Sequence, residues 1–170
     1  MASTVATTNK RSVQSTFTGK ASTMVPSIGT SPKRCWAQQM PPPTASPATI
    51  PTTTIISGRQ VEKRGMESCV AEALEIAGDG VDLIYVSVDI DCLAYPWTIG
   101  TSAASPEGLS AWQLLEGMFA CGQHPKVGAL DVVEIDPSRD VKDLTARSGC
   151  SVILTFLAGL YRRTYGDRGY

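Results

Sequence analysis

A short apolar segment that ends in two acidic residues constrains this chain more than any other feature. Residues 83–88, Leu-Ile-Tyr-Val-Ser-Val, are rich in β-branched and aromatic side chains and too short for a typical helix, so they predict a buried β-strand. Asp89 and Asp91 follow directly. Because positions two apart on a strand point to the same face, both carboxylates are predicted to project together from the carboxyl end of the strand, where ligands bind in open α/β sheets.

The acidic pair has two interpretations. Adjacent carboxylates repel each other unless a cation lies between them, and a divalent metal ion with oxygen ligands resolves that repulsion. An Asp pair after a strand also serves in loop solvation or in capping a helix. The pair alone leaves both interpretations open, so the rest of the chain has to decide between them.

The first 54 residues differ in composition from the rest. Residues 1–61 contain six basic residues and no acidic one. All 16 acidic residues and the other nine basic ones lie in residues 62–170, which therefore carry a net charge of about −7. The segment 1–54 is rich in Ser, Thr and Pro and lacks apolar periodicity. Such a segment buries too little surface to offset its ordering entropy, so we predict a disordered tail, 1–54, followed by one α/β domain, 55–170.

Composition also limits the partners and the location. The few basic residues of the tail are scattered and lack interleaved aromatics, which argues against nucleic-acid binding, and no segment predicts a membrane span. The expected location is the cytoplasm, although a basic, acid-free, Ser/Thr-rich start is also the composition of an organelle transit peptide. Five widely spaced cysteines favour free thiols over disulfides or a zinc site. Cys69, Cys121 and Cys150 fall in helical patterns and are predicted near the core.

The domain alternates helix and strand. A second buried strand is predicted at 127–135, and it also ends in acids. Glu134 is expected to continue the face of Leu130 and Val132, either as a site residue or as part of a solvated strand end. This order predicts a parallel sheet with helices on its faces, and two strands are too few for a free-standing sheet, which implies further strands from elsewhere. Helical periodicity covers 63–77, 110–120 (opened by the capping box Ser110 and Gln113) and 143–162.

A series of short motifs extends through the domain in a fixed order. They are Ser87-Val88-Asp89-Ile90-Asp91, Gly100-Thr101, Gly108-Leu109, Asp131-Val132-Val133-Glu134, and Asp140 with Thr145. In this order they resemble the C-terminal half of the ureohydrolases, the family of arginase, agmatinase and formimidoylglutamase. The resemblance covers residues 59–163. Residues 124–147 and 154–159 are most similar to formimidoylglutamase.

The resemblance implies a fold, a cofactor and a reaction. The family fold is a three-layer α/β/α sandwich around a parallel sheet, so a partial, arginase-like sandwich is expected here. Family members hold two Mn²⁺ ions. By resemblance, Asp89 and Asp91 match metal-binding carboxylates, and Glu134 matches the acid that orients the guanidino or formimino group of a small-molecule substrate. The implied reaction is hydrolysis of formimidoylglutamate to glutamate and formamide, as in histidine degradation, with an agmatinase-like guanidino hydrolase as the alternative.

The chain departs from the family pattern in its metal ligands. The family's upstream motifs, a histidine after glycines and an Asp-x-His-x-Asp, are not in this sequence, whose single histidine is His124. Ala94-Tyr95 stand where the family has Asp-Pro, and Ile99-Gly100 where it has Pro-Gly. Two carboxylates bind Mn²⁺ weakly, so we expect this polypeptide, interpreted as a truncated or wrongly assembled gene product, to be inactive by itself.

Other functions account for less of the sequence. An Asp-x-Asp motif also occurs in haloacid-dehalogenase-type phosphatases and in Mn²⁺-dependent glycosyltransferases, but the motif around Glu134 has no place in either. A non-catalytic pseudoenzyme or interaction fragment is the alternative that the missing metal ligands favour. The expected partners are then a second copy of the chain or a full-length homologue that covers the exposed sheet edge.

Overall fold

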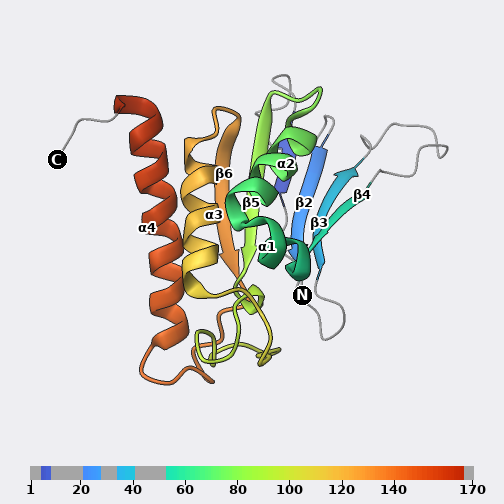
Figure 1. Cartoon of the computed structure of the whole chain (residues 1–170). Helices are drawn as coiled ribbons and strands as arrows, with labels where there is room; N and C mark the ends of the chain where they lie inside the picture. The colour runs from blue at the N-terminus through green and yellow to red at the C-terminus, as the bar shows by residue number, and fades with distance from the viewer. Residues whose placement is uncertain (1–4, 9–20, 28–33, 41–52, 167–170) are drawn as a thin grey trace.

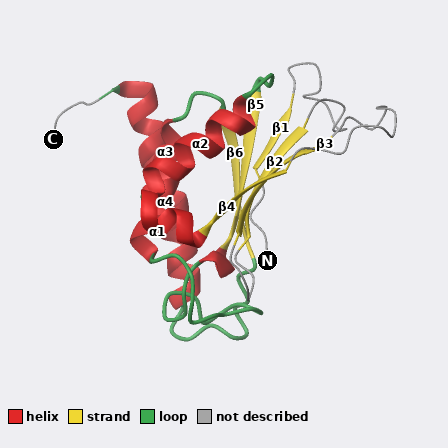
Figure 2. Ribbon diagram, turned by 45° about the vertical axis from the view of Figure 1, so that its right-hand side comes forward, coloured by secondary structure: helices red, strands yellow, loops and turns green. Residues whose placement is uncertain are grey.

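The computed structural model describes residues 5–8, 21–27, 34–40 and 53–166, which form a six-stranded sheet with its helices on one face (Figures 1 and 2). The strands in spatial order are β4 (Thr53–Ser57), β3 (Arg34–Met40), β2 (Ala21–Ser27), β1 (Val5–Thr8), β5 (Leu83–Asp89) and β6 (Val127–Val133). The helices are α1 (Gly58–Arg64), α2 (Met66–Gly78), α3 (Ala111–Gln123) and α4 (Leu144–Tyr165). The short 3₁₀ turn after β5 is η2 (Ile90–Cys92).

The predicted parallel strand pair is confirmed. β5 and β6 run parallel, with Ser87 opposite Asp131 and Asp89 opposite Val133. The carboxyl ends of both strands therefore meet at one edge of the sheet, which is where α/β proteins bind ligands. This register places the two acidic motifs of the sequence beside each other.

The predicted helices are confirmed, with changes at their ends. The first divides into α1 and α2 at Gly65, whose φ of 83° no ordinary residue adopts easily. At the start of α3, the Ser110 hydroxyl accepts the Gln113 N–H at 3.2 Å and the Gln113 side chain accepts the Ser110 N–H at 2.9 Å. This is the capping box that the sequence predicts, and it fixes where the long loop 93–110 ends.

The predicted disordered segment, 1–54, falls partly outside the described residues. Residues 1–4, 9–20, 28–33 and 41–52 are not described, so disorder there stays a prediction. In the described parts the backbone forms β1 to β4, which the sequence pattern did not predict. β1 pairs antiparallel with β5. With β5 and β6 alone, the backbone groups along the other edge of β5 would be unpaired, and β1 supplies their hydrogen-bond partners.

Alternate residues of β5 separate an apolar face from a polar one. Ile84, Val86 and Val88 are buried against the helix layer and are at most 1% exposed. Tyr85, Ser87 and Asp89 point the other way because side chains alternate along a strand. Sheet and helix layer make up two layers of the expected α/β/α arrangement (Figure 2). The core therefore holds β5 rigidly and presents Asp89 at its end.

Helices α3 and α4 pack unusually closely through two glycines. A Cβ added at Gly159 would lie 2.2 Å from the carbonyl oxygen of Phe119, and one added at Gly122 would lie 2.2 Å from that of Phe156. No side chain fits at either position because the obstacle is backbone. The contact therefore sets the distance between α4 and the rest of the helix layer.

Replacing Gly159 with alanine should separate the two helices. We expect Gly159→Ala to lower the free energy of unfolding by about 1–3 kcal/mol, because overpacking outweighs the better helix propensity of alanine. Gly78→Ala is the matched control, since its Cβ meets nothing nearer than Ile84 at 3.6 Å. Urea unfolding followed by circular dichroism measures both. Equal stability of the two variants would contradict the close α3–α4 packing.

The single histidine ends α3 at the edge of the sheet opposite the acidic motifs. His124 is the C-cap of α3, its Nδ1 accepts the Lys126 N–H at 3.3 Å, and its carbonyl oxygen accepts a hydrogen bond from Arg163. Burial lowers the pKa of His124, and the positive charges of Lys126 and Arg163 lower it further. The folded protein therefore disfavours the protonated imidazole.

This lowered pKa predicts a loss of stability in acid. The unfolded chain binds the His124 proton near pH 6.5, whereas the folded chain binds it only at lower pH, so the unfolding free energy falls as pH falls through this window. We expect His124→Gln to lose less stability than the unsubstituted chain between pH 7 and pH 5. Chemical unfolding at a series of pH values measures the difference. Parallel pH profiles would exclude this role for His124.

Candidate metal and substrate site at the ends of β5 and β6

Asp89 and Asp91 lie together at the end of β5, but only Asp89 belongs to the strand, so the alternation of side chains along a strand does not by itself explain their positions. β5 ends at Asp89, and Asp91 belongs to the turn η2. The Asp89 Oδ1 accepts the Asp91 N–H at 3.0 Å, so Asp89 also caps this turn. Each residue is only 1% exposed. Capping is therefore realised at Asp89, but it does not account for the burial of two carboxylates side by side.

The electrostatics of the pair are unfavourable in the absence of a cation. Burial, together with the charges of Asp91 and Glu134, raises the pKa of Asp89 to about 6. Burial likewise raises the pKa of Asp91, and the charge of Glu134 adds to this. The charge of Glu134 thus raises the pKa of both aspartates, so its carboxylate lies within a short electrostatic range of them. The structure thus brings Asp89, Asp91 and Glu134 to one place.

Asp91 has one oxygen engaged and one oxygen free. Its Oδ1 accepts a hydrogen bond from the hydroxyl of Thr101, which is 3% exposed. Its Oδ2 is buried and has no hydrogen-bond partner. A buried carboxylate oxygen without a partner is costly. Such an oxygen is suited to be a ligand of a divalent cation.

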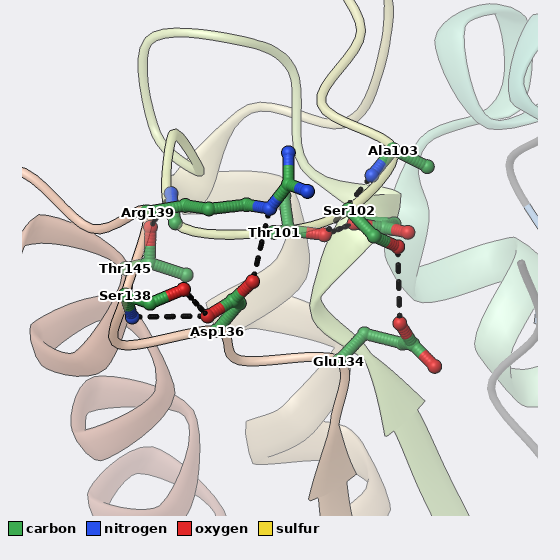
Figure 3. A network of polar contacts seen from close by, with 10 residues as sticks. Thr101, Ser102, Ala103, Glu134, Asp136, Ser138, Arg139 and Thr145 are labelled. Atoms are coloured by element: carbon green, nitrogen blue, oxygen red, sulfur yellow. Dashed lines mark hydrogen bonds and ion pairs between the residues drawn. The ribbon is translucent and has the colours of Figure 1, made fainter.

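The backbone at Glu134 corrects one sequence prediction. β6 ends at Val133, and Glu134 has a φ of 66°, in the left-handed region that non-glycine residues seldom adopt. Glu134 therefore does not continue the face of Leu130 and Val132, because the positive φ interrupts the alternation. Its exposed carboxylate accepts a hydrogen bond from the Ser102 hydroxyl at 3.3 Å (Figure 3). The turn redirects Glu134 toward the loop that follows β5.

Several residues that hold this site were not predicted as site residues. Thr101 contacts Asp91, Ser102 contacts Glu134, and Thr145 accepts the Gly100 N–H at 2.7 Å. Gly100-Thr101 and Thr145 stand in the motif series of the sequence, but the spacing of more than 40 residues between them gives no sign of contact. Only the order of the motifs could have indicated that they belong to one structure.

Two acidic side chains among the described residues offer oxygen atoms suited to a cation. The free Asp91 Oδ2 beside Asp89 fits one side of a cation, and hard oxygen donors suit Mn²⁺. Within residues 53–166, however, no group of three or more His, Cys, Asp or Glu side chains is arranged to hold a metal ion. These donors are therefore enough for some of the ligands of one metal ion, but not for a complete two-metal cluster.

The comparisons with known proteins agree with this arrangement. The profile of the arginase family matches residues 48–159. Formimidoylglutamase of Halalkalibacterium halodurans is 36% identical over 108 residues, which are 64% of this chain and 34% of the relative. Agmatinase of Proteus mirabilis is 33% identical over 104 residues, which are 61% of this chain and 33% of the relative.

Solved structures share the fold. Formimidoylglutamase of Bacillus subtilis superposes with a TM-score of 0.57 and 33% identity, over 60% of this chain and 32% of that one. Trypanosoma cruzi formiminoglutamase, solved with Mn²⁺, superposes with a TM-score of 0.55 and 25% identity, over 62% of this chain and 35% of that one.

Fold and site together define an α/β domain with acidic side chains gathered at the carboxyl ends of two parallel strands. With the profile match over 48–159, the chain belongs to the arginase family. It spans about a third of the length of the curated relatives that it matches.

Proposed function

We propose that Asp89 and Asp91 are ligands of Mn²⁺ in a hydrolase site of the arginase family, and that Glu134 binds the substrate. The observation that carries this proposal is the buried, unpartnered Oδ2 of Asp91 beside the buried Asp89. A divalent cation would offset the cost of burying this Asp91 oxygen beside a second carboxylate. The relatives support manganese, because one solved formiminoglutamase contains it.

The chemistry that Mn²⁺ supplies in such a site is a bound water of lowered pKa, which is available as hydroxide at neutral pH. The remaining work falls to the chain. Glu134 is exposed at the end of β6 and within electrostatic range of both aspartates. Its carboxylate can pair with a cationic amidine or guanidine group through charge-assisted hydrogen bonds. This pairing orients the imino carbon toward Asp89 and Asp91 and stabilises the charge on the nitrogens during attack by water.

Formimidoylglutamate is the substrate that we propose. Its formimino group is a linear amidine that carries a positive charge at neutral pH, and hydrolysis with one water gives glutamate and formamide. The similarity to formimidoylglutamases from two organisms supports this choice. Agmatine, hydrolysed to urea and an amine, is the alternative, because agmatinases match over a similar part of the chain.

We also propose that the 170-residue polypeptide alone binds manganese weakly and does not turn over. Its one histidine, His124, lies just before β6 begins, whereas Glu134 follows the strand's end. A seven-residue strand separates them by about 20 Å, so His124 cannot complete the site. The other ligands of a two-metal cluster would have to come from another polypeptide segment.

Manganese titration and product assay test this proposal. We expect the chain to bind Mn²⁺ with a dissociation constant on the order of 0.1–1 mM, as for sites with few carboxylate ligands, and Asp91→Asn to weaken binding at least tenfold. With formimidoylglutamate and saturating Mn²⁺, we expect no formamide. Electron paramagnetic resonance of free Mn²⁺ gives the affinity. Equal binding by the Asn variant would refute the metal role, and formamide release by the chain alone would refute inactivity.

A second candidate function is that of a partner for a full-length arginase-family subunit. Two surfaces favour it. β6 is the last strand of the described sheet and has one unpaired edge. The outer face of α4 is apolar, with Leu154 66% and Leu157 47% exposed, and it includes Cys150, which is exposed and not near the core as predicted. Such a helix is normally covered.

The composition of α4 also allows another environment. By length and composition alone it is, among the described residues, a helix apolar enough to cross a membrane, with a mean hydropathy of 1.3. Its packing on α3 through Gly159 is the arrangement of a helix in a folded protein, and 28% of the apolar window is buried. A protein partner accounts for both the buried and the exposed face.

Co-expression with a full-length formimidoylglutamase tests the partner proposal. We expect the chain to co-purify with the homologue, and Leu154→Glu with Leu157→Glu to abolish this, because two charges on the outer face of α4 oppose burial. Ser151→Glu, on an exposed flank of the same helix, is the control. A monodisperse monomer in the presence of the homologue would exclude this function.

A further inference from the structure

Two adjacent residues of the loop after β5 connect both strand ends of the site. The Thr101 hydroxyl donates to Asp91 Oδ1, at the end of β5. The neighbouring Ser102 hydroxyl donates to Glu134 Oε2 at 3.3 Å, at the end of β6 (Figure 3). The carboxylate proposed for metal and the one proposed for substrate are thus held by adjacent residues of one loop.

Residues before α4 and in its first turn hold the same loop segment in place. The Gly100 N–H donates to the Thr145 hydroxyl at 2.7 Å, and the Gly100 carbonyl accepts the Asp136 N–H at 2.8 Å. Thr145 is fully buried, and the Asp140 carboxylate accepts its N–H at 3.0 Å. These bonds tie the loop to the first turn of α4.

There is no room for the loop to shift toward α4. A Cβ at Gly100 would lie 2.5 Å from the Cβ of Asp140, which shows how closely the two segments pack. Thr101 itself is 3% exposed. Its hydroxyl therefore has a fixed position and direction, and Asp91 is the acceptor that it meets.

From this geometry we infer that Thr101 is a positioning residue for the metal ligand, an inference that rests on the proposed function. Its hydroxyl occupies Asp91 Oδ1 and so fixes the orientation of the carboxylate, whose other oxygen, Oδ2, is buried and has no hydrogen-bond partner. Without the hydroxyl, the carboxylate can rotate and offer neither oxygen in a fixed direction. Groups that hydrogen-bond to a metal ligand and orient it typically contribute about 10- to 100-fold to metal affinity.

The loop contains a matched control for this inference. Thr98 is also fully buried, but its hydroxyl donates to the carbonyl oxygen of Leu93 at 3.2 Å and not to a carboxylate. Removing either hydroxyl costs a buried hydrogen bond. Only the loss of the Thr101 hydroxyl should weaken metal binding. Comparing variants at Thr101 and Thr98 therefore separates a positioning role from a general effect on the loop.

The test compares Mn²⁺ binding by the full chain and its variants, measured by electron paramagnetic resonance. We expect Thr101→Val to weaken binding at least tenfold and to alter the spectrum of bound Mn²⁺. Thr101→Ser, which keeps the hydroxyl, should remain within threefold of the unsubstituted chain, and so should Thr98→Val. Circular dichroism verifies folding, and if Thr101→Val does not fold, the smaller Thr101→Ala carries the same expectation.

Each remaining outcome decides between the two claims. If the chain binds Mn²⁺ and Asp91→Asn abolishes binding, but Thr101→Val binds as the unsubstituted chain does, the positioning role is wrong and the metal role stands. Equal losses in Thr101→Val and Thr98→Val also overturn the positioning role, since the effect then belongs to the loop as a whole. No binding by the unsubstituted chain would end the proposed function, and the role of Thr101 with it.

Discussion

The desolvation of two neighbouring carboxylates at the end of β5 is the constraint on which the site depends. Asp89 and Asp91 are each 1% exposed, and burial raises the pKa of both. Such an arrangement opposes folding, and the apolar face of β5 must offset it. Ile84, Val86 and Val88 provide that burial. The strand therefore does two things: it anchors the core with one face and holds a strained acidic pair at its end, as functional sites commonly do.

Hydrogen bonds between residues distant in the sequence fix the orientation of the Asp91 carboxylate. Thr101 lies ten residues beyond Asp91, and Thr145 lies 45 residues beyond Gly100, yet the hydrogen bonds among them join the loop after β5 to the first turn of α4. The left-handed backbone at Glu134 turns its carboxylate toward the same loop. Direction of a ligand oxygen is a property of these contacts, since a carboxylate by itself rotates freely.

Membership of the arginase family gives the acidic cluster its chemical context. The chain covers about a third of its relatives, and among the described residues no group of three or more His, Cys, Asp or Glu side chains is arranged to hold a metal ion. In the function that we propose, the carboxylate pair and the third acid nearby form one side of a hydrolytic site for a cationic amidine. The described residues also leave the outer edge of β6 unpaired and the outer face of α4 apolar.

The sequence by itself determined the local elements and the kinds of chemistry available. The apolar run 83–88, the capping box at Ser110 and the periodicity of α4 predicted strand and helices correctly, because each depends on neighbours within a few residues. The order of the acidic motifs placed Asp89, Asp91 and Glu134 at adjacent strand ends. Only the tertiary structure decided that β6 ends at Val133, that Thr101 engages one oxygen of Asp91, and that Gly100 packs against Asp140. The physical reason is that these contacts join residues distant in the chain, and their geometry follows from packing rather than from local pattern.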